Sequence, residues 1–150
     1  MKRIVLLLGI LVFVSCKKEV KAQKPKVVTV KEPIVEECFR GISGKDTVTL
    51  NIYRQGSQIS DGKLQYRLFA KDKNEGTLVG QIKGDTLFAA YSFSSEGSNS
   101  TREVAFLKKG VNYVEGYGEV KDDGHGNVTF KDTRHLHFDG KMTLSKIPCQ

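Results

Sequence analysis

Hydrophobic and polar positions alternate along most of the chain after residue 37. Apolar side chains stand at every second position in several runs, among them Val48, Leu50 and Ile52, then Leu64, Tyr66 and Leu68, then Leu87, Ala89, Tyr91 and Phe93. A period of two is typical of β-strands with one buried face. No stretch shows the i, i+3, i+4 spacing over a length that predicts a helix.

Polar stretches rich in glycine separate these runs and predict the turns. "RQGSQ", "KDKNEG" and "KDDGHGN" mark three of them, Lys83-Gly84 and Lys109-Gly110 predict tight turns, and "SSEGSNS" predicts a longer loop over residues 94–100. Shorter alternating pairs complete the pattern, namely Val104 with Phe106, Val128 with Phe130, Leu136 with Phe138, and Met142 with Leu144. The chain therefore predicts eight or nine strands.

Short connections force neighbouring strands to pair antiparallel. A meander of this many strands leaves two open edges, and closing the sheet on itself removes them. We therefore expect an all-β fold, an up-and-down barrel of about eight strands over residues 38–150. An open β-sandwich is the alternative.

The first residues have the pattern of an export signal. Lys2 and Arg3 precede Ile4–Val14, an apolar run of 11 residues. A membrane-spanning helix needs about 20 apolar residues, so this run fits the core of a cleaved signal instead. The run ends at Ser15-Cys16, which resembles the lipobox of bacterial lipoproteins, although Phe13-Val14 differs from the usual residues there. The resemblance implies cleavage after residue 15 and lipidation of Cys16.

The segment that follows Cys16 predicts a flexible tether over residues 16–37. It carries two prolines and alternating charges, and it has no apolar stripe. The chain has a formal net charge of +7, but residues 38–150 carry only +3. The basic character is therefore partly a property of signal and tether, and we expect no binding of nucleic acid.

The other two cysteines, Cys38 and Cys149, bracket the predicted domain. Disulfides persist outside the cytoplasm, so we expect these two to pair with each other. Such a bond joins the first strand to the last, which suits a closed barrel.

A polar cluster is predicted inside the barrel. Tyr113, Glu115 and Tyr117 share one face of a strand, and Arg102 shares a face with the apolar positions of the neighbouring strand. A buried carboxylate needs a partner, and Arg102 is the candidate for Glu115. The four residues predict either a small-ligand site or an internal salt bridge.

Two histidines predict a possible metal site. His135 and His137 in "TRHLHFD" are two residues apart, which places them on one face if the segment is a strand. Imidazole suits zinc or copper. The alternative is a solvated outer face, with Leu136 and Phe138 pointing inward.

Catalytic patterns are absent from the sequence. It holds no GxSxG, no HExxH and no CxxC, and neither GxG stretch opens a predicted helix. We therefore expect a protein that is not an enzyme and needs no cofactor.

The pattern Ser15-Cys16-Lys17-Lys18-Glu19 resembles lipoproteins of Bacteroidota-type Gram-negative bacteria. "SEGSNSTREVAFL" and "EGYGE" look like small uncharacterised lipoproteins from the same bacteria, and the architecture resembles calycin-like domains and lysozyme-inhibitor lipoproteins. The resemblance implies a monomer held by lipid on the outer membrane, at its periplasmic or surface face. We expect it to bind a small ligand, an envelope polymer or a protein. Two further hypotheses are an inhibitor of a secreted hydrolase such as lysozyme, acting through residues 94–100, and a metal-binding module.

Overall fold

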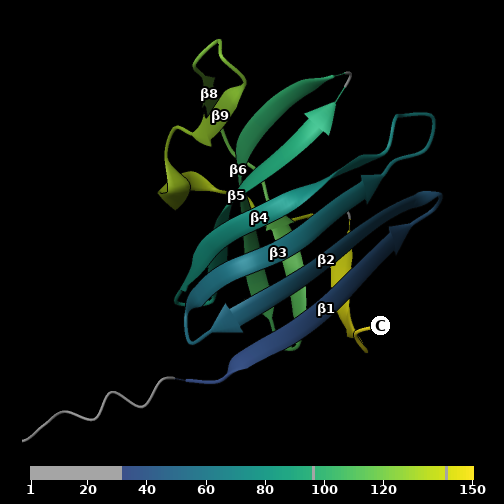
Figure 1. Ribbon diagram of the computed structural model, residues 1–150, viewed down its shortest axis with the longest axis vertical. Coiled ribbons are helices and arrows are strands. Elements are labelled where there is room, and N and C mark those ends of the chain that lie inside the picture. Colours follow the sequence, from purple (N-terminus) through teal and green to yellow (C-terminus); the bar gives the residue numbers. More distant parts are fainter. Residues whose placement is uncertain (1–31, 96, 141) are drawn as a thin grey trace, which may run out of the picture. The chain divides into compact units, whose positions relative to one another are not determined.

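A computed structural model describes residues 32–95, 97–140 and 142–150 (Figure 1). The predicted signal, the lipidation site Cys16 and most of the predicted tether lie outside the described residues. Within the described part, no helix is long and apolar enough to cross a membrane.

The described residues form ten strands and one short 3₁₀ helix, η1 (Thr133–His135). The strands are β1 (Ile34–Ser43), β2 (Asp46–Gln55), β3 (Gln58–Arg67), β4 (Asn74–Lys83), β5 (Thr86–Ser95), β6 (Ser98–Lys109), β7 (Asn112–Gly116), β8 (Val120–Asp122), β9 (Asn127–Phe130) and β10 (Thr143–Ile147). β1 begins four residues before the predicted domain start, so residues 34–37 belong to the sheet and not to the tether.

Eight of these strands close into an antiparallel barrel, as predicted. The order around the ring is β5-β4-β3-β2-β1-β10-β7-β6, and β6 pairs with β5 to complete it. The open sandwich is therefore not the fold. β8 and β9 form a hairpin outside the ring, attached where β9 pairs parallel with β6, and Figure 1 shows this hairpin apart from the ring strands.

Tight turns join the strands at one end of the barrel. Two residues join β2 to β3, β4 to β5, and β6 to β7. Gly84 and Gly110 have φ values of 60° and 65°, a region that favours glycine because it has no Cβ. Both residues belong to the tight turns that the sequence predicts.

The alternating apolar positions point inward and form the core of the barrel. Leu50, Leu64, Leu78 and Leu87 are fully buried there, and Tyr91 is buried with them. They come from four successive strands, β2 to β5, so the core is built from contacts between the inward faces of several strands.

Two segments differ from their predicted structure. The predicted loop over residues 94–100 is instead the end of the β5–β6 hairpin, where only two residues separate the strands and Ser94 pairs with Asn99. Leu136 and Phe138 were expected on a strand, but no strand forms between β9 and β10.

Glycines on β7 and just after it explain the second difference. The ring of Phe138 occupies the space where a side chain at Gly116 would lie, and Leu136 does the same at Gly118. Leu136 and Phe138 therefore pack against the outside of the barrel and do not point into it.

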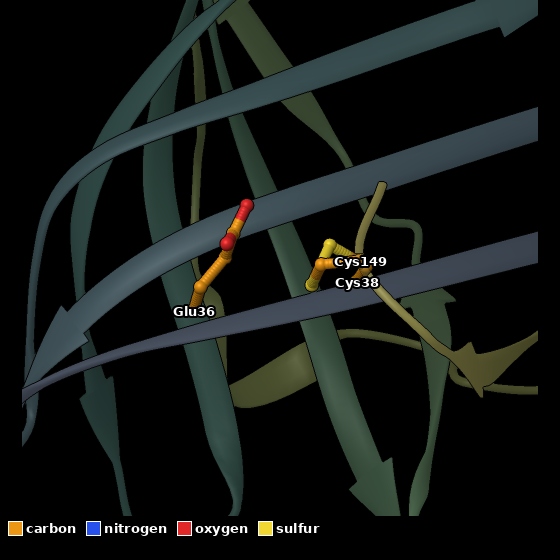
Figure 2. A group of neighbouring side chains, drawn as sticks. All are labelled: Glu36, Cys38 and Cys149. Atoms are coloured by element: carbon orange, nitrogen blue, oxygen red, sulfur yellow. A yellow bond between two sulfur atoms is a disulfide. The ribbon is translucent and has the colours of Figure 1, made fainter.

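The disulfide links the two strands that close the ring. β1 pairs with β10, and the Cα atoms of Cys38 and Cys149 lie 5.3 Å apart with their sulfurs bonded (Figure 2). Cys38 is 2% exposed, on the face of β1 opposite Phe39. The pairing of these two cysteines is as the sequence predicts.

This bond should contribute strongly to stability. It closes a loop with a sequence separation of 111 residues, for which chain entropy gives about 4–5 kcal/mol. We expect the double variant Cys38→Ser/Cys149→Ser to lose roughly that free energy of unfolding in urea denaturation. Reductant should lower the stability of the native protein to the level of the variant, and should leave the variant unchanged. Equal stability with and without reductant would contradict this.

Candidate functional site

The two ends of the barrel differ. At the end holding the β2–β3 turn, Glu37 is buried and paired with two cations. Its Oε2 lies 2.7 Å from Arg54 Nε, and its Oε1 lies 2.8 Å from Lys146 Nζ. Burial alone would raise the pKa of Glu37, but the hydrogen bonds from Lys146 and Arg54 outweigh it and the pKa is lowered. The ion pairs of Glu37 with Arg54 and Lys146 therefore close this end of the interior, which is called the sealed end below.

The opposite end contains a cavity of about 850 Å³ that opens to solvent. The ends of β1, β3 and β7, the starts of β2, β4 and β10 and the middle of β6 surround it, with β8 and β9 forming one side wall. Its lining includes apolar positions at Val48, Leu68, Val104, Val128, Phe130, Met142 and Leu144 and polar ones at Tyr66, Asn74, Arg102, Glu115 and Tyr117. This size lies within the range of small-molecule sites.

Glu115 lies on the cavity wall, held by two tyrosine hydroxyls. Tyr66 donates to Oε1 at 2.6 Å, and Tyr117 donates to Oε2 at 3.0 Å. Glu115 is 8% exposed, and burial raises its pKa by more than the tyrosines and the charge of Arg102 lower it. The carboxyl is therefore positioned by neutral donors and not by an ion pair.

The same environment acts on the tyrosines. Burial and the nearby Glu115 raise the pKa of Tyr66 and Tyr117 well above the ordinary value. Burial raises the pKa of Tyr91 to about 12, and its hydroxyl donates to Asn74. All three phenols therefore stay protonated and act as hydrogen-bond donors at neutral pH.

Arg102 faces the same cavity from β6. Its guanidinium lies over three aromatic rings, with 5.1 Å to the centre of Tyr66, 5.7 Å to Tyr91 and 5.8 Å to Phe93. Its Nε is buried without a hydrogen-bond acceptor. The ion pairs among the described residues do not include one between Arg102 and Glu115.

The predicted cluster is thus only partly assembled. Arg102, Glu115 and Tyr117 all line the cavity. Tyr113 does not; it is buried deeper, with its ring 4.9 Å from that of Phe39. Their role in binding a ligand stays a prediction.

Sequence reasoning missed Tyr66, Tyr91 and Asn74. Each occupies an inward position of β3, β5 or β4, where an apolar role is the simplest interpretation. The barrel brings them to Glu115 and Arg102 across a ring whose closure had to be known first. The alternation at Tyr66 and Tyr91 was a usable signal, because a buried phenol usually finds a hydrogen-bond partner.

The two histidines do not lie on a common strand, contrary to the expectation for residues 135 and 137. His135 ends η1, with Nδ1 3.0 Å from Asp132 Oδ2. His137 forms a backbone bridge with Tyr117, with N–O distances of 2.8 and 2.9 Å. Both side chains are exposed, and metal binding by them stays a prediction.

Another set of possible ligand atoms lies on the outer wall. Glu36, Cys38 and Cys149 place one oxygen and two sulfurs within 4.8 Å of one another. Figure 2 shows that the two sulfurs form the disulfide, with Glu36 beside it on β1. Because a metal binds thiolate sulfur, this group is not a metal site in the oxidised protein.

Comparisons with models of protein families, with curated proteins and with solved structures found no significant match for this chain. The fold and the cavity therefore carry the functional argument.

The two buried carboxyls predict opposite pH dependences. The ordinary pKa is 4.5 for both; it is raised in folded Glu115 and lowered in folded Glu37. A raised pKa means that Glu115 stabilises the fold fully below 4.5 and loses this contribution as the pH rises through its folded pKa. A lowered pKa means that the contribution of Glu37 is complete above 4.5 and is lost as the pH falls through its folded pKa.

Urea denaturation across pH should show this contrast. The free energy of unfolding of the native protein minus that of Glu115→Gln should fall as the pH rises above 4.5. The same difference for Glu37→Gln should fall as the pH drops below 4.5. Differences that change in the same direction for both variants would contradict the assignment.

Proposed function

We propose that this protein is a lipid-anchored binding protein of the Gram-negative cell envelope, without enzymatic activity, whose barrel holds a small ligand. The observation that supports it is the cavity of about 850 Å³ at one end of a barrel whose other end is filled. A barrel that holds no ligand is expected to fill this space with side chains, because protein interiors normally pack without voids.

The lining supports binding more than catalysis. Glu115 has each oxygen bonded to a phenol that stays protonated at neutral pH, so in this arrangement neither oxygen is free to take a proton from a substrate. The cavity combines apolar walls with a few polar groups, as small-molecule sites do.

The anchor rests on the sequence around Cys16. Mass spectrometry of membrane fractions from the producing bacterium should find a chain that begins at Cys16 and carries acyl groups on it. Two or more acyl chains give stable membrane attachment. Cys16→Ser should abolish the lipid and leave the protein unprocessed, whereas Cys38→Ser should not affect acylation. An unmodified Cys16 in the purified native protein would rule the anchor out.

A bound ligand should be recoverable from the native protein. Native mass spectrometry should detect a non-covalent small molecule, and Leu68→Trp should abolish it because Leu68 lines the cavity. Val111→Trp is the matched control, since Val111 is 66% exposed in the β6–β7 turn at the sealed end. Thermal unfolding should show that both variants fold. Equal ligand content in both variants would contradict binding in this cavity.

A further inference from the structure

Arg102 is a half-buried cation of the cavity, and no ion pair among the described residues includes it. Arginine stays charged and offers five N–H donors in a planar fork. The Nε of Arg102 is shut off from solvent and has no hydrogen-bond acceptor within the described part of the chain. The side chain lines the cavity beside Tyr66. An unpaired donor in a low-dielectric site is costly, and a missing acceptor explains it.

The carboxylates of the cavity do not fill this role. Both oxygens of Glu115 accept from tyrosines. Asp46 accepts from the backbone N–H of Phe69 at 2.7 Å, and Glu103 accepts from that of Phe130 at 3.0 Å. These acids hold their own neighbourhood together and form no ion pair with Arg102 among the described residues, which leaves its guanidinium open to an acceptor supplied by a ligand.

Apolar residues form much of the cavity wall on the side of Arg102 that faces the core. Val104 is the next inward residue of β6, and Leu144 and Val48 face it across the barrel. The rings of Tyr66, Tyr91 and Phe93 cover one side of the guanidinium and reduce its contact with water. A ligand that satisfies the arginine therefore places the remainder of its body against hydrocarbon.

We propose that the cavity takes an amphiphilic organic acid, whose carboxylate receives two N–H donors from Arg102 and whose apolar body lies along Val104, Leu144 and Met142. Arginine matches a planar carboxylate in a bidentate arrangement, which is a strong, charge-assisted type of pair. The assignment rests on the proposed ligand-binding function and specifies its substrate class.

The charges at the rim of the cavity favour a different kind of ligand. The exposed Asp72 and Asp139 at the mouth join Asp46 and Glu103 as acids, whereas Lys71 is a base there. A rim with more acids than bases favours an amphiphilic cation at the entrance. A comparison of acid, alcohol and amine with one shared chain separates the two.

The test uses isothermal titration calorimetry with decanoate, decanol and decylamine, each below its aggregation concentration. The protein is residues 16–150 with Cys16→Ser, which includes the whole compact unit Lys31–Gln150. Each probe is titrated into this protein and into Arg102→Gln, Arg102→Lys and Arg67→Gln. Arg67 is the matched control, because it follows Tyr66 on β3 but is exposed on the outer face.

We expect decanoate to bind most tightly. Arg102→Gln should weaken decanoate by about 10- to 100-fold, as loss of a charge-assisted pair implies, and should change decanol by less than about twofold. Arg102→Lys should fall between, since it keeps the charge and loses the fork. Arg67→Gln should bind like the unsubstituted protein, and thermal unfolding should confirm that each variant folds.

The other outcomes separate this assignment from the function on which it rests. Equal affinity for all three probes with no effect of Arg102→Gln would overturn the carboxylate assignment and keep a ligand-binding cavity. Tighter binding of decylamine would do the same and identify the rim as the recognition element. Binding of none of the probes would overturn the amphiphilic acid, and the ligand found or not found by native mass spectrometry would then decide the cavity's function separately.

Discussion

Closure of the sheet is the constraint on which the rest of this structure depends. An antiparallel meander with free edges exposes unpaired N–H and C=O groups at both sides. Here β1 pairs with β10 and β5 pairs with β6, so the eight-stranded ring has no free edge among the described residues. The Cys38–Cys149 bond fixes the pairing that joins the two ends of the chain. Only in the closed ring do inward residues of distant strands surround one interior.

The two ends of that interior each hold a buried glutamate, and the two glutamates have different partners. Glu37 meets two cations and closes its end with an ion-pair network. Glu115 accepts hydrogen bonds from two phenols. The guanidinium of Arg102 lies over aromatic rings and forms no ion pair among the described residues. Charge is therefore neutralised by contact at one end and left available at the other. The same barrel thus combines an end stabilised by ion pairs with an end that we propose for ligand recognition.

The sequence predicted the strands, the ring and the disulfide, and it missed contacts that depend on the register around the ring. The strands and the tight turns at Gly84 and Gly110 followed from short patterns, and the disulfide followed from two cysteines that bracket the domain. Leu136 and Phe138 alternate like a strand, but the space above Gly116 and Gly118 gives them an apolar surface outside the barrel. Arg102 and Glu115 were expected to pair because their strands are neighbours. Instead, Tyr66 donates a hydrogen bond to Glu115. The two residues are 49 positions apart in the sequence, and no local pattern contains this contact.

The direction of the first and last ring strands has a further consequence. The chain enters β1 at the end that holds Glu37, and it leaves β10 toward the same end, where Lys146 reaches Glu37. The cavity opens at the opposite end, among residues that follow β3 and β7 and precede β10. The described part of the chain is therefore entered and left at the sealed end of the barrel. The entrance is lined by the segments that connect β3 to β4 and β7 to β10, together with the strand ends beside them.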